Sequence, residues 1–554
     1  MQASVSLGKP LMPQLEQFFL KRIDSAQLEK CVQIVANLNE RLANSLLANE
    51  STATVLRNKG HWTDMQILQL ITGFAVRRAS LRDEIYCQIC KQIQHDQGSM
   101  ESCLKGWVLL CVCLGVFAPS ERLHDCLQQM IEENAPTLPL LMSCRARLSK
   151  CADMSQRECP LSQLEYQMLI RGCESSCSVC VHLMDSMETG SAEIFKFNCH
   201  TTVHELFREL CHRIRLQDVF GFAIFLLFDG QLSPLGSGPL MDVFYRCEQY
   251  IQSHIDTLES ASSRYVKMQH ELREAFTPED VVLNLPWNFI IRKQIFAPWH
   301  DPLEDPVASN LICCQLFQGL FQGHYAIASD SKLAYLLALR FYVSGMSSRS
   351  FEMSRAAMRK QVKILLTELT QSGHSKSSHF GWSKNLDLDR WTNLVIEACV
   401  SKKLFTKHPS LDTIRAELVR FTMNEWSEQF SKFYPVLSLA HNGEQTADFD
   451  CELFLKLNHI GLEIVQNVKN AKIAIAQQPF KLSAESQHLS EHSATDRALY
   501  PANLLTIETL QERRYVFSTS HAKQINDILV YILNQLKTRS NYVIATNNYG
   551  RKRG

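Results

Sequence analysis

The sequence predicts a multidomain α+β protein in which helical and strand-rich segments alternate along the chain. Its 554 residues correspond to about four domains of roughly 150 residues. Apolar residues recur at helical spacing in two long stretches, and short apolar runs between turn residues occupy two others. The composition, 45% hydrophobic and 21% charged, is typical of a chain that buries a core. The predicted boundaries are 1–165, 177–272, 273–433 and 434–546, with 547–554 as a flexible tail.

The first segment is predicted to be an all-α helical bundle. Ser80 and Asp83 match a capping box, which would start a helix. Apolar residues then recur at helical spacing: Ile85, Tyr86, Ile89, Cys90 and Ile93. Trp107–Phe117 is apolar on every side, so we expect it to be the buried central helix, ended by Pro119.

The second segment has the element order of a ubiquitin-like β-grasp. Val179–Leu183 and Ala192–Phe197 have the composition of two paired strands. Thr202 and Glu205 form a second capping box, which predicts the start of an amphipathic helix. Gly221–Phe228 is a continuous apolar run that ends in an Asp-Gly turn, as in a buried strand. Strand, strand, helix and strand follow each other within about fifty residues.

The third segment is predicted to be helical and the fourth to be a barrel closed by a helix. The helical segments are Trp287–Ile295, Asn310–Phe321 and Leu333–Val343, and Gln371–Ser383 is a polar loop. The predicted strands of the fourth segment are Cys451–Leu457, Ile460–Val465, Leu504–Thr509 and Tyr515–Thr519. The last helix has a continuous apolar stripe: Ile525, Ile528, Leu529, Ile532, Leu533 and Leu536. Antiparallel strands closed by one helix indicate a pleckstrin- or phosphotyrosine-binding-like barrel.

Charge and segment composition limit the function classes. Lys and Arg number 57, as do Asp and Glu, so the formal net charge is zero. This balance argues against a dedicated nucleic-acid or membrane-surface binder. The longest charge-free apolar run, Trp107–Ala118, is too short to span a bilayer, and the N-terminus lacks signal-peptide features. Twenty Cys without an export signal predict reduced, mostly buried thiols in a cytoplasmic protein.

We expect no enzyme activity and no cofactor. The sequence has no GxxxxGK[ST] loop, no complete HExxH motif and no GxSxG elbow. One constellation could bind zinc: Cys177 and Cys180, followed by His200 and His204. The two cysteines have opposite parity on a predicted strand, which would point them to opposite faces. A zinc-binding protein built on this set remains a remote alternative.

Four sequence segments resemble one family. LRDEIYCQICKQI (Leu81–Ile93) and WVLLCVCLGVFAPS (Trp107–Ser120) closely resemble the signature of the myosin tail homology 4 domain. PWNFIIRKQIFAPWHDPLEDPVASNLI (Pro286–Ile312) resembles the signature of FERM domains in unconventional myosin tails. LKTRSNYVIA (Leu536–Ala545) is similar to the end of class VII-like tails. The pattern departs from the family at Asn541 and in the polar insertion Gln477–Asn503.

The resemblance implies a tail homology bundle followed by a three-lobed FERM module. Its lobes would be a ubiquitin-like β-grasp, an acyl-CoA-binding-protein-like helical lobe and a PH/PTB-like barrel. The implied function is that of a non-catalytic cargo-binding and cytoskeletal adaptor tail of an actin-based unconventional myosin. The implied partners are cytoplasmic tails of membrane proteins or scaffold proteins, microtubules and a motor head. The implied location is cytoplasmic, at actin-rich protrusions or the cell cortex. A headless pleckstrin-homology-containing adaptor is the alternative.

Basic residues are the candidate partner-binding sites. Residues 1–165 contain 17 basic and 17 acidic side chains, so a microtubule site would need a local patch. The candidates for that patch are Arg57, Lys59, Arg77, Arg78, Arg82, Arg145, Arg147 and Lys150. The barrel could accept an extended partner strand in a groove between the final helix and the strand near Tyr515–Thr519 or its neighbours, with Arg513, Arg514 and Tyr515 as candidate contacts. A helical partner could instead lie across the lobes. The resemblance further implies that Lys537 and Arg539 help the tail fold back onto a motor head.

Overall fold

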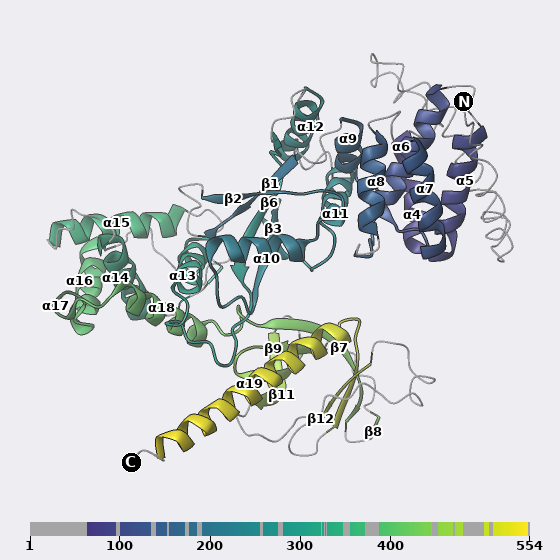
Figure 1. The fold of residues 1–554 in the computed structure, drawn as a ribbon. Helices are drawn as coiled ribbons and strands as arrows, with labels where there is room; N and C mark the ends of the chain where they lie inside the picture. Colours follow the sequence, from purple (N-terminus) through teal and green to yellow (C-terminus); the bar gives the residue numbers. More distant parts are fainter. Residues whose placement is uncertain are drawn as a thin grey trace. The chain divides into compact units, whose positions relative to one another are not determined.

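The computed structural model describes most of the chain after residue 63 (Figure 1). The described ranges are 64–95, 100–134, 140–151, 155–171, 177–184, 191–254, 259–274, 281–322, 324–325, 327, 329–346, 355–371, 387–441, 444–445, 453–468, 471–479, 504–508 and 514–551. The chain forms two compact units. The first comprises Met1–His182, Gly190–Leu210 and Ile224–Ile290, and the second comprises Leu183–Thr189, Cys211–Ala223 and Ile291–Gly554.

The first unit begins with the predicted helical bundle. Its elements are α4 (Asp64–Arg77), η1 (Ala79–Leu81), α5 (Arg82–His95), α6 (Met100–Val116), α7 (Glu121–Asn134), α8 (Leu140–Lys150) and α9 (Gln163–Arg171). Every residue from Gly106 to Phe117 is buried, which confirms the prediction of a central helix. The apolar stripe of α5 packs into the same core, and its Tyr86 hydroxyl donates to the carbonyl of Phe117 at 2.6 Å. A helix that is apolar all round is stable only when other helices surround it.

The predicted capping box at Ser80 is wrong. Ser80 lies inside the short helix η1, and α5 begins only at Arg82. Asp83 instead accepts a hydrogen bond from the backbone N–H of Ser120 at 2.9 Å, ahead of α7. The Asp83 carboxylate therefore accepts from a backbone N–H at the start of a different helix. Local sequence spacing does not indicate this long-range contact.

The ubiquitin-like lobe completes most of the first unit. Its elements are β1 (Cys177–His182), β2 (Ala192–Lys196), α10 (Val203–Ile214), β3 (Phe222–Phe228), β4 (Gln231–Pro234), α11 (Leu240–Ser253), α12 (Glu259–Glu274), β5 (Val281–Val282) and β6 (Asn288–Lys293). The sheet order is β2-β1-β6-β3-β4, and β5 pairs with β1. Val179 lies opposite Phe195 in the antiparallel β1–β2 pair, as the strand prediction requires.

Local chemistry explains the start of α10 and the turn after β3. The N–H of Glu205 donates to Thr202 Oγ1 at 3.1 Å, and the N–H of Thr202 donates to Glu205 Oε2 at 2.9 Å. This reciprocal pair confirms the predicted capping box. Asp229 and Gly230 both have positive φ, of 50° and 72°, which suits the tight turn between β3 and β4. The second half of β3 is only half-buried, so the predicted burial of that strand holds for its first residues alone.

The segment Trp287–Ile295, predicted to be helical, is a strand. Its residues Asn288–Lys293 form β6, which pairs in parallel with β1 through Val181 and Phe289. Phe289, Ile290 and Ile291 are all buried because both faces of this central strand are covered. A short continuous apolar run cannot be assigned to helix or strand by periodicity alone. The ubiquitin-like sheet therefore uses residues beyond position 272.

Buried charges join the bundle to the ubiquitin-like lobe. The Arg157 guanidinium donates to Asp242 Oδ1 of α11 at 2.6 Å and to Glu165 Oε2 of α9 at 3.1 Å. Glu248, also on α11, accepts the backbone N–H groups of Gln163 and Leu164 at the start of α9, at 2.7 and 2.9 Å. Burial and the nearby Glu165 raise the pKa of Glu248 to about 7. Such buried groups are stable only while paired, so they hold the two parts together.

The helical lobe lies in the second unit. Its helices are α13 (Pro306–Phe321), α14 (Asp330–Met346), α15 (Arg355–Gln371), α16 (Leu388–Ser401), α17 (Leu404–Lys407) and α18 (Leu411–Glu425). The predicted segments Asn310–Phe321 and Leu333–Val343 lie within α13 and α14, as expected. The predicted loop Gln371–Ser383 lies outside the described residues except for its first residue, which ends α15.

Asp305 organises the start of this lobe. Its Oδ1 accepts the N–H groups of Val307 and Ala308 as the N-cap of α13, and its Oδ2 accepts those of Gln217 and Asp218 at 2.7 and 2.8 Å. Next to it, the buried Lys293 ammonium donates to Asp218 Oδ2 at 3.1 Å. Burial raises the pKa of Asp218, but hydrogen bonds from His300 and Lys293 outweigh this effect and hold it at about 2.

The barrel lobe ends the second unit. Its elements are β7 (Lys432–His441), β8 (Glu444–Gln445), β9 (Leu453–Leu457), β10 (Gly461–Val468), β11 (Ala471–Pro479), β12 (Leu504–Glu508), β13 (Arg514–Ser518) and α19 (Ala522–Arg551). The sheet order is β11-β10-β9-β7-β13-β12. The first half of β7 pairs with β9 and its second half with β13, which curls the sheet. Ile525 and Leu529 of α19 fill the resulting core, confirming the predicted stripe and the PH/PTB-like lobe (Figure 1).

We expect Gly115→Ala to destabilise the first unit. A Cβ on Gly115 would overlap Nη1 of Arg147 and lie 2.9 Å from Glu165 Oε1. Overpacking of about 1–3 kcal/mol should outweigh the gain in helix propensity of about 1 kcal/mol. Thermal unfolding followed by circular dichroism should therefore show a lower Tm.

The matched control is Gly73→Ala in α4, where a Cβ would meet Pro160 Cγ at an ordinary 3.6 Å. This variant should unfold at or above the wild-type temperature. If Gly115→Ala did the same, the packing around the buried charges would not be as tight as described.

Candidate functional site

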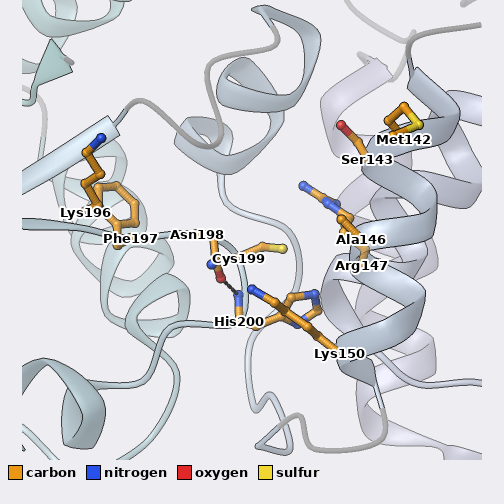
Figure 2. A pocket seen from close by; sticks show the side chains of 10 residues that line it. All are labelled: Met142, Ser143, Ala146, Arg147, Lys150, Lys196, Phe197, Asn198, Cys199 and His200. Atoms are coloured by element: carbon orange, nitrogen blue, oxygen red, sulfur yellow. Dashed lines mark hydrogen bonds between the residues drawn. The ribbon is translucent and has the colours of Figure 1, made fainter. Parts of the chain in front are cut away.

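A groove in the first unit lies between α8 of the bundle and the segment that follows β2 (Figure 2). Its volume is about 460 Å³. The lining residues are Met142, Ser143, Ala146, Arg147, Lys150, Lys196, Phe197, Asn198, Cys199 and His200. This lining contains three cationic side chains and, among the described residues, no carboxylate. The groove exists only because the bundle and the ubiquitin-like lobe are joined.

Helix α8 supplies one wall through its periodicity. Leu141, Cys144 and Leu148 turn into the bundle core, where each is at most 2% exposed. Met142 and Lys150 therefore lie on the outer side, and Met142 is 59% exposed. The helix thus presents an apolar group near its start and a cation at its end.

A hydrogen-bonded turn supplies the other wall. The N–H of Asn198 donates to Thr201 Oγ1 at 2.9 Å, and the Asn198 side chain accepts the N–H of His200 at 2.9 Å. Such local bonds from Asn and Thr side chains fold the backbone without a strand partner. The turn holds His200 beside Lys150, as Figure 2 shows.

His200 has unused hydrogen-bonding capacity in this groove. Both ring nitrogens are buried and have no partner among the described groups. Burial, together with Arg147, Lys150 and Arg157, lowers the pKa of His200 to about 4, so the ring is neutral at pH 7. A neutral imidazole offers one N–H donor and one acceptor. The ring of His200 therefore has hydrogen-bonding capacity that no described group uses, beside the exposed Lys150.

The predicted microtubule residues separate in the structure. Arg77, Arg78, Arg145 and Lys150 are exposed, whereas Arg82 is half-buried and donates to the carbonyl of Ala75. Arg147 is only 3% exposed, and its Nη1 donates to the carbonyl of Cys111. The prediction that Arg147 belongs to an outer basic patch is wrong, because burial at the bundle interior makes its charge part of the core network. Arg57 and Lys59 lie outside the described residues.

The predicted peptide-binding strand is not at a sheet edge. β13 pairs with β12 on one side and β7 on the other, so its backbone groups are already used. Among the described strands, β12 ends the sheet on this side. In the register, Arg514 lies opposite Glu508 and Tyr515 opposite Ile507. Arg513 lies outside the described residues.

The two predicted basic residues of the last helix differ in environment. Lys537 is exposed on α19. The Arg539 guanidinium lies over the Trp299 ring, 5.4 Å from its centroid, in a cation–π contact. Phe220 stacks on Tyr531 of the same helix, with ring centroids 5.5 Å apart. Arg539 is therefore engaged within its own unit, whereas Lys537 points its charge to solvent.

The residues of the zinc alternative do not converge. Cys177 is buried on β1, Cys180 is half-buried, and His204 is exposed on α10. In the described part of the chain, no three or more His, Cys, Asp or Glu side chains form a group that could hold a metal ion. Cys87 and Cys90 lie in the bundle core, where burial raises the pKa of the Cys87 thiol to about 12. Among the helices of the described residues, none combines the length and apolarity needed to cross a bilayer.

Sequence reasoning missed the groove itself. No sequence motif includes Lys196, Phe197 or Asn198, which line the groove. The sequence presents His200 only as a candidate zinc ligand. The one available signal was the Asn-Cys-His-Thr turn between a strand and a capping box. That signal predicts a turn but not the helix that faces it.

Family models match both the helical bundle and the ubiquitin-like lobe. The MyTH4 domain model matches residues 68–168, and the model of an RA-like domain matches residues 176–275. Myosin-VIIa of Drosophila melanogaster is 27% identical over 531 residues, covering 95% of this chain and 22% of that protein. Unconventional myosin heavy chain 6 of Caenorhabditis elegans is 28% identical over 494 residues, covering 89% and 21%. The chain spans about a fifth of these relatives.

Solved structures agree on the fold. The MyTH4-FERM MF2 domain of Dictyostelium discoideum myosin VII has 16% sequence identity and a TM-score of 0.56, covering 93% of this chain and 89% of that chain. The C-terminal MyTH4-FERM domain of human myosin 7b, solved in complex with the harmonin-a PDZ3 domain, has 17% identity and a TM-score of 0.50, covering 90% and 88%. The chain therefore consists of a MyTH4 domain followed by a FERM-type module and is homologous to the tails of class VII myosins.

Proposed function

We propose that this chain is a non-catalytic cargo-binding and cytoskeletal adaptor tail of an actin-based unconventional myosin. The observation that carries the proposal is the groove between α8 and the segment after β2, which both domains form together. The buried pairs of Arg157 with Asp242 and Glu165 keep its walls in place. A preformed concave surface of this kind binds a partner without first paying an ordering cost.

The proposed partners are scaffold proteins and the cytoplasmic tails of membrane proteins. The human myosin 7b MyTH4-FERM domain, solved with a harmonin-a PDZ3 domain, supports the scaffold class. The proposed location is the cytoplasmic, actin-rich cortex or protrusions, as for an actin-based motor. A headless adaptor that links membrane proteins to the cytoskeleton is the alternative, and the coding sequence upstream of Met1 decides between them.

Partner capture by the barrel lobe should depend on Arg513 and Arg514. We expect Arg513→Glu with Arg514→Glu to weaken capture of acidic receptor tails severalfold, because partner carboxylates would meet like charge. Pulldown of the purified full chain by immobilised tails measures this effect.

Lys360→Glu with Lys363→Glu is the control, since both lysines are exposed on α15. If the Arg513 and Arg514 variant, the control and the wild type were captured equally, a role for these two arginines would be contradicted. If the wild-type chain captured none of the scaffold proteins and receptor tails tested, the proposed function itself would be contradicted.

Microtubule attachment is a second proposed activity, based on the exposed Arg78, Arg145 and Lys150. Microtubules are acidic, so the bound fraction should fall as salt rises. Co-sedimentation at low salt should show binding that the triple change of these residues to Glu reduces at least fivefold. Arg122→Glu, an exposed change on α7, is the control. No co-sedimentation of wild type at low salt would remove this activity.

Inhibition of a motor head is a third proposed activity, assigned mainly to the exposed Lys537. Adding the chain in trans to a class VII motor head should lower its actin-activated ATPase severalfold. Lys537→Glu should relieve that effect, whereas Lys523→Glu, an exposed change on the same helix, should not. An unaltered ATPase with wild type would contradict inhibition.

A further inference from the structure

Another pocket lies in the second unit, where α19 meets the segments 217–220 and 299–305. Its volume is about 230 Å³. Sites for drug-sized ligands usually measure roughly 300–1,000 Å³, so this smaller pocket suits one long side chain of a partner. Its lining combines aromatic rings with carboxylates, unlike the lining of the groove in the first unit.

Three aromatic rings line this pocket and contact one another. Phe220 stacks on Tyr531 with an angle of 7° between the ring planes, and Trp299 packs against both. Tyr531 is 45% exposed, and Trp299 and Phe220 are half-buried. The faces of such rings carry partial negative charge and attract cations. The aromatic cluster is therefore open to a cation that arrives from solvent.

The chain itself places a cation on this aromatic cluster. The guanidinium of Arg539 lies over the Trp299 ring, and the Arg539 side chain is otherwise exposed. No carboxylate of the described residues forms an ion pair with this guanidinium. The cluster therefore accepts a guanidinium group, and the group now there is not fixed by a charged partner.

One carboxylate of the pocket is available to a ligand. Asp218 and Asp305 use their oxygens in the buried contacts described above, and Asp301 pairs with Arg420 at 3.4 Å. Glu304 is exposed, and its carboxylate has no hydrogen-bond or ion-pair partner among the described residues. A cation that enters the pocket can therefore pair with Glu304 without breaking an existing contact.

The charges of the lining favour a cation over an anion. Among the described residues, four carboxylates line the pocket, and Arg539 is its one permanently charged cation. An anionic ligand could pair with Arg539, but the Glu304 carboxylate and the aromatic faces would repel it. Arginine fits better than lysine, since its planar group can stack on a ring and pair with a carboxylate at its edge.

We propose that this pocket binds an arginine side chain from a basic segment of a cargo protein. The guanidinium of the partner pairs with Glu304 and stacks on the face of Tyr531 that Phe220 leaves open. Arg539 is the internal competitor, because it occupies the same aromatic cluster and repels a second cation. The proposal rests on the cargo-binding function and names the partner chemistry at a defined pocket.

Phage selection on the full chain tests this inference. A random twelve-residue peptide library is selected on the wild-type chain and counter-selected on the Glu304→Lys variant. The expected result is enrichment of sequences that contain arginine. Enrichment of acidic or neutral sequences, or no enrichment that depends on Glu304, would overturn the proposal.

Binding of an enriched peptide is then measured by fluorescence anisotropy, and the two key variants should act in opposite directions. Glu304→Gln should weaken binding at least threefold, whereas Arg539→Gln should strengthen it at least threefold. A folding defect cannot produce the stronger binding. The controls Glu397→Gln on α16 and Lys523→Gln on α19 are exposed changes outside the pocket, so they should leave the affinity within twofold of wild type.

The peptide itself provides the second arm of this experiment. Replacing its arginine by citrulline, which removes the charge, should weaken binding at least tenfold, and replacement by lysine should weaken it less. Equal binding of the arginine and citrulline peptides would overturn the proposal. Weaker binding to the Arg539→Gln variant would also overturn it, since Arg539 would then be a contact and not a competitor.

The pocket assignment and the cargo function fail separately. If wild type captures scaffold or receptor tails but the Glu304 and Arg539 variants bind the enriched peptide as wild type does, the pocket assignment fails and the cargo function stands. If wild type captures no tail but binds the peptide with the expected opposite effects, the cargo function fails and the pocket assignment stands.

Discussion

The buried guanidinium of Arg157 is the interaction on which the first unit depends. It lies between Glu165 of the bundle and Asp242 of the ubiquitin-like lobe, and the side chains of Arg157 and Glu165 are only 1% exposed. Removing one partner of such a buried set leaves an uncompensated charge, at a cost of about 3–5 kcal/mol. Glu248 adds a second link by accepting the first N–H groups of α9. These buried contacts therefore tie the bundle to the ubiquitin-like lobe.

A comparable set of buried polar contacts stabilises the second unit. Asp305 uses both carboxylate oxygens, one to cap α13 and one to bind the backbone at Gln217 and Asp218. Lys293, which is fully buried, donates to Asp218 and to the carbonyl of Phe220. Gln315 completes the set by pairing with both the N–H and the carbonyl of Lys293. In both units a few satisfied polar groups, rather than apolar area alone, specify how neighbouring segments meet.

Glu248 and Asp218, whose pKa values are shifted, serve structural pairs: Glu248 accepts hydrogen bonds from backbone donors, and Asp218 meets a lysine and a histidine. Buried thiols such as Cys87 have a raised pKa and lie in the core, where they are poor nucleophiles. His200 differs from these groups because both of its ring nitrogens are buried and have no hydrogen-bond partner among the described groups. Burial, together with the nearby cations, lowers its pKa. His200 therefore has hydrogen-bonding capacity that no described group uses.

Features that depend on local spacing can be predicted from the sequence alone. The all-apolar helix α6, the capping box of Thr202 and Glu205, the Asp229-Gly230 turn and the stripe of α19 all follow from residues within one or two turns of each other. It also contained the signatures of the MyTH4–FERM order.

Features that depend on distant partners become visible only in the folded chain. Asn288–Lys293 is a strand because β1 lies beside it, and Asp83 binds Ser120 because the bundle brings them together. Arg147 is not part of an outer patch for the same reason, because its guanidinium donates to the carbonyl of Cys111 inside the bundle. The groove combines residues of α8 with residues about fifty positions later. Spacing along the chain does not predict that these two segments lie side by side, because buried ion pairs between the two domains bring them together.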